Sequence, residues 1–423
     1  MSRLAQHGGV PVRTQPWPQW PQSTAKTEQA LLTVMRSGRW SVSGLETDGG
    51  PTWDRRFAEA FARYNGVGFC VPTVNGTNAL MCAMQALGIG VGDEVIVPGL
   101  TWVACASAVL AVNAIPVIVD IDPLSLCLDP AAVEAAIGPR TRAIMAVHLY
   151  NAIADLDALL ALAQRHRLDL IEDCAQAHGA RWRGRRVGSV GTVGTFSMQN
   201  GKVLTSGEGG ACICDDPHLA ARIFRLHADG RRLRAEPALP GYMSLEEDGH
   251  GFARNACLSE LQAAVLLSRL EDLDKENAQR AHQARALRGH LREIGGFTFQ
   301  HSAPGTEATT LYHFPVRLEA PEFAGISAAK IAAALSAELG CWVHTPYPPM
   351  DEFGLLDPGS PPRLPAAPRV PEPLRNARAA HRQHVVLPHW LFLTDGDAMA
   401  QIADAFAKVK QHAGSLRAIE GEV

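Results

Sequence analysis

Short apolar runs alternate with longer segments of helical periodicity between about residues 68 and 172. The first run, residues 68–71, leads through Asn75-Gly76-Thr77 into residues 78–87, whose apolar spacing fits one face of a helix that ends at Gly88. The same alternation predicts four more strands and two more helices. The strands are expected at 94–97, 115–120, 143–148 and 169–172, and the helices at 102–112 and 156–166.

This alternation is typical of a mostly parallel, doubly wound sheet that has helices on both faces, so the predicted fold class is α/β. Ligands of such sheets bind at the carboxyl ends of the strands. We therefore expect the chemistry of the protein to lie in the loops that follow strands.

A long amphipathic stretch, residues 258–291, follows the alternating region, and its charged residues are typical of a solvated helix face. Apolar runs at 297–300 and 312–318 come next and predict the strands of a second, smaller α+β domain. The predicted organisation is an N-terminal arm (1–25), a large domain (26–275) and a small C-terminal domain (276–423).

Composition narrows the class of protein and of partner. The 423 residues are 47% apolar, and 39 Lys and Arg stand against 43 Asp and Glu. This near-neutral balance offers no basic surface for nucleic acid and favours a small-molecule partner. Because Ser107, Asn113 and Pro116 interrupt the longest apolar stretch and residues 1–22 contain no apolar run, we expect no membrane span, no secretory signal and a cytoplasmic protein.

The cysteines and histidines suggest neither a disulfide framework nor a metal site. The nine cysteines include no C-x-x-C pair, and the 16 histidines form no cluster with the spacing of metal ligands. We expect the cysteines to be free thiols that pack as small apolar side chains.

Asn75-Gly76-Thr77 stands where a strand becomes a helix. The free amides of a first helical turn, together with a hydroxyl, can bind a phosphate, and Gly76 would let the anion come close. The alternative is that Thr77 caps the first turn and has no further role.

Asp173 ends an apolar strand, where a carboxylate is costly to bury unless it meets a cation. One such cation is the protonated pyridine nitrogen of a cofactor that stores carbanion electrons, because a nearby carboxylate favours the protonated ring. The alternative is that Asp173 caps the next turn. Gln176 and His178 follow closely.

Lys202 lies in the glycine-rich stretch 195–210, and it comes 29 residues after Asp173. A desolvated ε-amine near another cation can have a pKa low enough to form an imine and then to transfer protons. A solvated surface lysine is the alternative for Lys202 alone. A lysine, a strand-end aspartate and a phosphate loop on one α/β domain rarely occur together by chance.

On these motifs the chain resembles the fold-type I PLP enzymes and, among them, the DegT/DnrJ/StrS sugar aminotransferases. The matching stretches are 99–104, 171–180, 196–210 and 255–264. Ser-Met-Gln before Lys202, Leu-Thr-Ser-Gly-Glu-Gly-Gly after it, and Asn-Ala-Cys-Leu-Ser-Glu from Asn255 are similar to the branch that uses glutamine to aminate scyllo-inosose or 2-deoxy-scyllo-inosose. These keto-cyclitols belong to aminoglycoside antibiotic pathways.

The resemblance implies pyridoxal 5'-phosphate (PLP) as cofactor, a homodimer with a shared active site, and a role for each matching residue. Ordinary core packing is the alternative for Trp102, and a strand-end cap is the alternative for Ser197. The implied roles are covalent PLP binding by Lys202, pairing of Asp173 with the pyridine nitrogen, contact of Gln176 with the ring 3-oxygen, stacking of Trp102 on the ring, phosphate binding by Gly76, Thr77 and Ser197, phosphate binding by Asn255 from the neighbouring subunit, and lining of the substrate pocket by Tyr347.

Two departures bear on the substrate. Asn151 follows Tyr150 where many sugar aminotransferases have glycine, and Cys257 stands where they often have arginine. Both departures disfavour nucleotide sugars as substrates, because the diphosphate of such a sugar benefits from cationic groups in the site.

The alternative functions are an aminohydroxybenzoate-type dehydratase or aromatase, a nucleotide-ketosugar aminotransferase and a non-catalytic PLP-binding regulator. The two inososes differ by one hydroxyl, and the sequence leaves the choice between them open, as it does amination of a second ketone.

Overall fold

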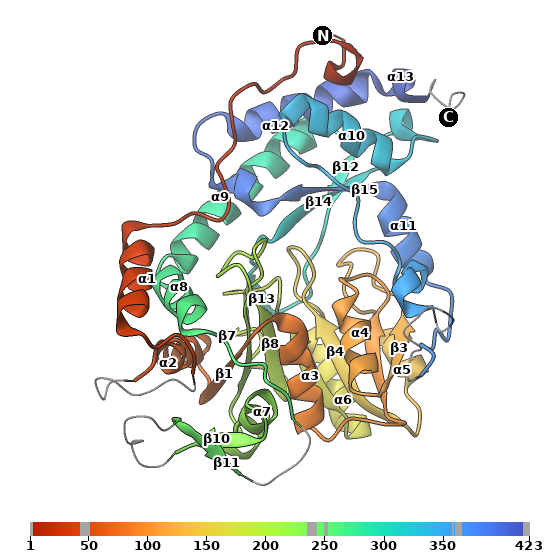
Figure 1. Cartoon of the computed structure of the whole chain (residues 1–423). Helices are drawn as coiled ribbons and strands as arrows, with labels where there is room; N and C mark the ends of the chain where they lie inside the picture. Colours follow the sequence, from red (N-terminus) through yellow and green to blue (C-terminus); the bar gives the residue numbers. More distant parts are fainter. Residues whose placement is uncertain are drawn as a thin grey trace.

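The computed structural model describes residues 3–42, 51–234, 243–248, 253–357, 359 and 366–417. Residues 1–2 of the predicted arm and residues 418–423 of the predicted small domain lie outside the described residues. Helices surround two separate sheets that form a large lower lobe and a small upper lobe in Figure 1. The helices are α1 (Ala25–Ser37), α2 (Trp53–Asn65), α3 (Gly76–Ala86), α4 (Ala104–Ala111), α5 (Pro130–Ala136), α6 (Leu156–His166), α7 (Pro217–His227), α8 (Glu260–Leu270), α9 (Leu273–Ile294), α10 (Ala328–Leu339), α11 (Arg375–Gln383), α12 (Ala398–Gln411) and α13 (Ala413–Arg417).

A seven-stranded sheet in the order β1-β9-β8-β5-β4-β2-β3 forms the centre of the large lobe. Strand β9 is antiparallel to both of its neighbours, and the other six strands of the sheet run in one direction, so the predicted mostly parallel α/β fold is confirmed. Helix α3 contacts α4 and α7, and α5 contacts α6. Both groups of helices pack on the sheet, which explains why its central strands are buried. The strands are β1 (Phe69–Thr73), β2 (Glu94–Pro98), β3 (Ile115–Val119), β4 (Thr141–Val147), β5 (Asp169–Asp173), β8 (Val193–Ser197) and β9 (Gly210–Cys214).

Three small sheets complete the described strands. An antiparallel sheet in the order β12-β14-β15 lies in the small lobe, where α10 and α12 cover it and Phe314, Leu335 and Phe406 are part of the core. The other two small sheets have two strands and three strands. The strands are β12 (Phe297–Phe299), β14 (His313–Leu318), β15 (His384–Pro388), β10 (Arg231–Leu233) with β11 (Leu245–Glu247), and β13 (Thr306–Ala308) with β6 (Arg181–Trp182) and β7 (Arg185–Arg186).

The predicted helical stretch 258–291 consists of two helices. Between α8 and α9 the helix is interrupted after Leu270. Helix α8 packs on α1 and α2 beside the large sheet, whereas α9 packs on α12 of the small lobe. The interruption therefore lies where the chain passes from one hydrophobic core to the other, and periodicity alone does not reveal such a passage.

The N-terminal segment runs from the small lobe down to α1, along the left edge of Figure 1. Leu4 is buried in the core of the small lobe, and the Ala5 and Val12 N–H groups donate to the Glu338 carboxylate at 2.8 and 3.1 Å. Trp17 Nε1 donates to the Leu339 carbonyl at 2.7 Å. The segment is therefore anchored to the small lobe before it reaches the large one.

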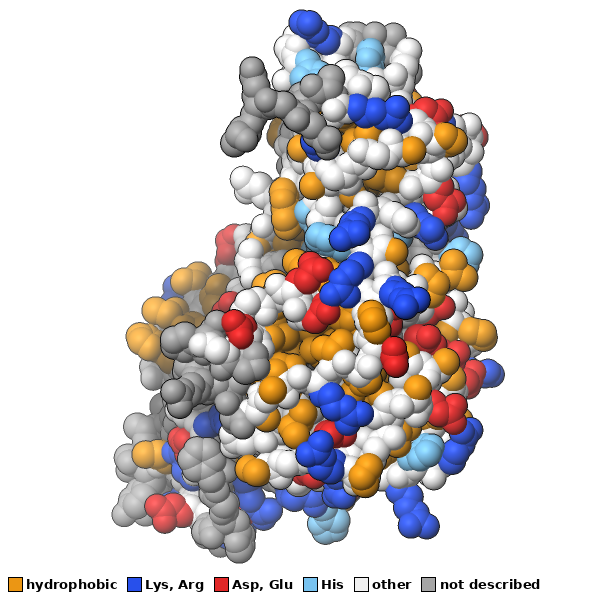
Figure 2. Space-filling model, turned by 90° about the vertical axis from the view of Figure 1, so that its right-hand side faces the viewer, with side chains coloured by type: hydrophobic (Ala, Val, Ile, Leu, Met, Phe, Trp, Pro, Cys, Tyr) orange, Lys and Arg blue, Asp and Glu red, His pale blue; other side chains and the backbone are white. Residues whose placement is uncertain are grey.

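Acidic and basic side chains are interspersed over the face of the molecule shown in Figure 2. Within the described ranges, none of the helices combines the length and the apolar character needed to cross a bilayer.

Candidate active site

A cavity of about 670 Å³ opens at the carboxyl ends of β5 and β8 and extends to residues 342–348 of the C-terminal part. It brings together eight of the nine residues singled out from the sequence and leaves Asn255 outside. The eight that line it are Gly76, Thr77, Trp102, Asp173, Gln176, Ser197, Lys202 and Tyr347.

The N-terminus of α3 lies against the end of β8. A Cβ on residue 76 would stand 2.6 Å from Ser197 Cβ, so this approach requires glycine. The N-cap of α3 is Asn75, whose side chain accepts a hydrogen bond from the Asn78 N–H at 2.8 Å. The alternative that Thr77 caps the helix is therefore wrong, and its side chain lines the cavity at the positive end of the helix dipole.

Asp173 is the last residue of β5 and is buried. In the described part of the chain its carboxylate has two neutral partners: Oδ2 accepts from the Cys105 thiol at 3.3 Å, and Oδ1 accepts from the Ala175 N–H at 2.9 Å. Asp173 thus caps the next turn and also lacks a cationic partner. A buried carboxylate in this state fits the protonated nitrogen of a PLP ring.

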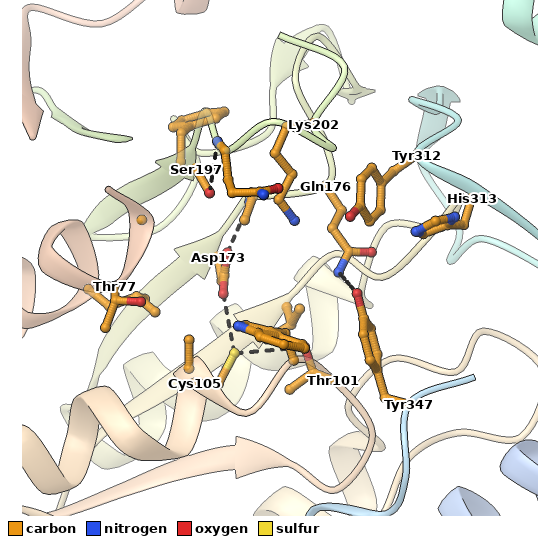
Figure 3. A pocket seen from close by; sticks show the side chains of 18 of the residues that line it. Thr77, Thr101, Cys105, Asp173, Gln176, Ser197, Lys202, Tyr312, His313 and Tyr347 are labelled. Carbon is orange, nitrogen blue, oxygen red and sulfur yellow. Dashed lines mark hydrogen bonds between the residues drawn. The ribbon is translucent and has the colours of Figure 1, made fainter. Parts of the chain in front are cut away.

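Lys202 is 9% exposed, so the alternative of a solvated surface lysine is wrong. Its side chain points between Asp173 and Gln176, and its Nζ lies 4.3 Å from the ring centroid of Tyr312 (Figure 3). Burial, followed by the charge of Lys202, lowers the pKa of His178 to about 3. The imidazole of His178 is therefore neutral at ordinary pH.

Gln176 presents its amide nitrogen to the cavity. Its Oε1 accepts from the Tyr150 N–H at 2.8 Å, which identifies the other end of the amide as the donor. That Nε2 lies 3.5 Å from Tyr347 Oη (Figure 3). A donor at this place fits the 3-oxygen of a PLP ring.

Aromatic rings form the wall beyond Lys202. Tyr347 stacks on Tyr150 with centroids 5.6 Å apart and 19° between the planes, and Trp102 lies 5.9 Å from Tyr347. Trp102 is 55% exposed, so the alternative that it packs in the core is wrong.

Ser197 Oγ accepts a hydrogen bond from the Gln199 N–H at 3.4 Å, which is a long contact at the end of β8.

Several cavity residues were not predicted from the sequence. Burial, then His344 and Lys202, hold the pKa of His313 well below its usual range. Among the described residues, His313 Nδ1 and His344 Nε2 have no hydrogen-bond partner. Cys105 could have been found by extending the motif at 99–104 by one residue, whereas the others lie far from Lys202 in sequence. The residues missed are Cys105, Tyr312, His313, Trp342, His344 and His381.

A buried cluster of His148, Glu172 and Cys174 lies behind Asp173, with potential ligand atoms within 4.8 Å of one another. Hydrogen bonds occupy the imidazole and the carboxylate of this cluster. His148 Nδ1 accepts from the Ala154 N–H at 3.2 Å, and Nε2 is 3.1 Å from Glu172 Oε2. The Glu172 carboxylate also accepts from three backbone N–H groups in the loop 188–191. The cluster thus anchors that loop to β5.

Asn255 is exposed and pairs through its backbone with Ala228. The next residues lie beside the end of β1, since the Val74 N–H donates to the Ala256 carbonyl at 2.7 Å. Asn255 is therefore near the start of α3 yet outside the cavity of its own chain.

Comparisons with known proteins agree with this geometry. Residues 21–407 match the DegT/DnrJ/EryC1/StrS aminotransferase family. The chain is 50% identical over 422 residues to an L-glutamine:2-deoxy-scyllo-inosose aminotransferase of Streptomyces lividus, which covers 98% of this chain and 99% of that protein. It is 49% identical over 415 residues to an L-glutamine:scyllo-inosose aminotransferase of Streptomyces griseus, which covers 96% and 97%. The crystal structure of 3-amino-5-hydroxybenzoic acid synthase aligns with a TM-score of 0.81 at 30% identity and covers 94% of this chain and 98% of that one.

Proposed function

Because the chain belongs to the DegT/DnrJ/EryC1/StrS aminotransferase family, we propose that it moves the amino group of L-glutamine onto a keto-cyclitol through PLP. The acceptor is 2-deoxy-scyllo-inosose or scyllo-inosose, and the pathway is aminoglycoside antibiotic biosynthesis. The observation that carries this proposal is the convergence of Lys202, Asp173 and the Gly76–Ser197 approach on one cavity.

When bound, PLP supplies an electron sink for the carbanion that forms when the donor loses its α-proton. Lys202 would bind the cofactor covalently. After glutamine displaces it, its Nζ would take the α-proton of glutamine and deliver it to the aldehyde carbon of the cofactor, a role that contributes roughly 10²–10⁴-fold to the rate. Asp173 would keep the proton on the ring nitrogen. Gln176 Nε2 would donate to the ring 3-oxygen, and Trp102 would stack on the ring.

The phosphate would lie at the start of α3, against Gly76, Thr77 and Ser197. Asn255 would reach the phosphate of a second copy in a homodimer with shared active sites. Its exposed position outside its own cavity supports this arrangement. Apolar side chains near α1 support it as well, because Leu32, Met35 and Trp40 are 46–50% exposed and would be covered by a partner subunit.

The substrate end of the cavity favours an uncharged polyol. The described residues that line it include no arginine, and its imidazole and aromatic groups, such as His313 and Tyr347, suit hydroxyl groups better than a diphosphate. The identity to the keto-cyclitol enzymes, about 50%, also exceeds the 30% identity to the aminohydroxybenzoate synthase. The first observation favours a keto-cyclitol over a nucleotide-linked ketosugar, and the second favours it over the aminohydroxybenzoate-type reaction.

The test is to incubate the purified PLP-loaded protein with glutamine and each inosose separately and to identify the product by mass spectrometry. We expect the corresponding amino-cyclitol. Amination of a nucleotide-linked ketosugar with neither inosose used, or an aromatic product from an aminocyclohexenone, would replace the proposal. A cofactor absorbance that glutamine leaves unchanged would favour the non-catalytic regulator.

A further inference from the structure

The two carbonyls that precede Lys202 are held by side chains from opposite ends of the chain. Trp20 Nε1 donates to the Asn200 carbonyl at 3.1 Å, and His389 Nε2 lies 3.1 Å from the Gly201 carbonyl. The rings of Trp20 and His389 pack edge to face, with centroids 4.6 Å apart and 86° between the planes. The turn that carries the lysine is thus held from outside its own element.

His389 is suited to donate to a carbonyl. Its side chain is fully buried, and burial, followed by the nearby Arg280 and then His313, holds its pKa well below the usual range. A neutral imidazole has one N–H, and the contact with the Gly201 carbonyl assigns that hydrogen to Nε2. Nδ1 has no partner within the described residues.

The same contacts extend to the lysine amine. His389 stacks on Tyr312 with centroids 6.1 Å apart and 28° between the planes, and the Tyr312 ring faces Lys202 Nζ at 4.3 Å. Figure 3 shows Tyr312 beside Lys202 on the cavity wall. His389 therefore contacts both the backbone before Lys202 and the ring that its amine faces.

Trp20 is itself anchored on both sides. Arg280 lies over its ring at 5.3 Å and is held by Glu276 at 2.9 Å. Three residues earlier, Trp17 fastens the same segment to the small lobe through the Leu339 carbonyl. The indole that donates to the Asn200 carbonyl is therefore held in place by α9.

We propose that Trp20 and His389, which hold the turn 199–202 through its carbonyls, are positioning residues for Lys202. The inference rests on the proposed role of Lys202 in the aminotransferase. Without the two donors, the turn can relax and the amine no longer stays at the place where it reacts with the cofactor and receives the α-proton. Small displacements of a reacting group are costly to the rate.

The test compares Trp20→Phe and His389→Phe with Trp17→Phe. Each variant keeps an aromatic ring and loses one N–H donor, but the bond of Trp17 lies at the small lobe, away from the lysine. The first readout is the pH midpoint of the visible absorbance of the lysine-bound cofactor. The second is the single-turnover rate with glutamine. We expect Trp20→Phe and His389→Phe to move the midpoint by about 0.5 pH unit or more and to slow the turnover about tenfold with a smaller change in KM.

Trp17→Phe is expected to leave both readouts unchanged even if thermal stability falls. His389→Gln, which offers an amide donor at a similar reach, should recover part of the rate. If Trp20→Phe and His389→Phe behave like Trp17→Phe, the positioning role is wrong.

A third readout does not depend on the proposed activity. In protein stripped of cofactor, the rate at which acetic anhydride acetylates Lys202, measured by mass spectrometry, should rise in Trp20→Phe and His389→Phe and stay constant in Trp17→Phe. Failure of the proposed function would appear in the wild type as a missing lysine adduct with PLP. An unchanged acetylation rate in the two variants would contradict the positioning role alone.

Discussion

The Cys105 thiol donates a hydrogen bond to Oδ2 of Asp173, with 3.3 Å between sulfur and oxygen. Burial, followed by the charge of Asp173, raises the pKa of this thiol well above its usual range, so it stays protonated and donates its hydrogen to the carboxylate. The second oxygen of Asp173 is fixed by the Ala175 N–H. The carboxylate is therefore held in one orientation by neutral groups, and its charge remains available for a cationic ring nitrogen.

Asp173→Asn should retain bound PLP yet transfer amines poorly, because an amide does not keep the ring nitrogen protonated. We expect turnover with glutamine and an inosose to fall roughly 10²-fold or more. PLP content is measured by absorbance and turnover by product formation. Cys105→Ser, which keeps a hydrogen-bond donor, should lose far less activity. Equal turnover in Asp173→Asn and the wild type would refute the assigned role.

Lys202→Ala should abolish the covalent link between the protein and PLP. Borohydride reduction of the wild type followed by digestion and mass spectrometry should give a modified peptide that contains residue 202, and the variant should give none. Lys26→Ala removes an exposed lysine that pairs with Glu271 and should leave the adduct at residue 202 intact. If the Lys202→Ala variant still gave an adduct at another lysine, that lysine and not Lys202 would be the residue that binds PLP.

The elements of the large sheet could be predicted because local patterns encode them. The helix expected at 156–166 is α6, whose start is fixed by the Asp155 side chain accepting from the Ala158 N–H. The strand expected at 143–148 is β4, displaced by two residues at its start. The order of strands could not be predicted in this way, because β9 lies antiparallel between β1 and β8 through pairings of residues far apart in sequence.

The residues of the candidate site also differ in whether a local sequence pattern predicts them. Lys202, Asp173 and Gly76 belong to motifs whose residues are close in sequence, and the family match confirms the resemblance drawn from those motifs. The contact between Trp20 and Asn200 joins residues 180 positions apart, and His389 reaches Gly201 from 188 positions away. Such contacts depend on how the two lobes pack, which no local pattern encodes.

Gly76→Ala should weaken cofactor binding. The added methyl group would stand 2.6 Å from Ser197 Cβ, so α3 or the end of β8 must move and the phosphate loses its contacts. We expect the Kd for PLP to rise about tenfold or more, measured by titrating the stripped protein. Gly289→Ala in α9 is the matched control, since no heavy atom lies within 4 Å of the new Cβ. It should keep the affinity and stabilise the fold by about 1 kcal/mol. If Gly76→Ala bound PLP with the same Kd as the wild type, the close approach of residue 76 to Ser197 would not contribute to cofactor binding.

Stability should decrease as the pH falls below about 6.5. Burial lowers the pKa of His384 to about 4, while the unfolded chain keeps the ordinary value. Between these values the unfolded state binds the extra proton, so the free energy of unfolding falls with pH by up to about 1.4 kcal/mol per unit from this group. Urea midpoints at pH 4.5 to 8 measure the slope. His384→Asn, which can still donate to the Ala380 carbonyl, should make the slope shallower. His166→Asn, at an exposed position, should leave it unchanged, and an unchanged slope in His384→Asn would contradict the account.

His313 should affect the acceptor more than the donor of the amino group. His313 and His344 line the cavity, and one ring nitrogen of each has no partner in the part of the chain described. A buried nitrogen without a hydrogen bond costs about 1–3 kcal/mol, and a hydroxyl of a bound keto-cyclitol would provide the missing bond. His313→Phe should therefore slow the step with the inosose by roughly 10–100-fold and change the glutamine step less.

The two steps can be measured separately by single-turnover absorbance, with glutamine added to the PLP form and the inosose added to the amine-loaded form. His301→Phe changes an exposed histidine outside the cavity and should leave both steps intact. Comparing the two inososes in His313→Phe then reports on the hydroxyl by which they differ. A larger loss with the fully hydroxylated substrate would mean that His313 binds that hydroxyl, whereas equal losses would mean that it binds one the two substrates share. If the glutamine step slows as much as the inosose step, His313 acts on the cofactor or on Lys202 and does not recognise the cyclitol.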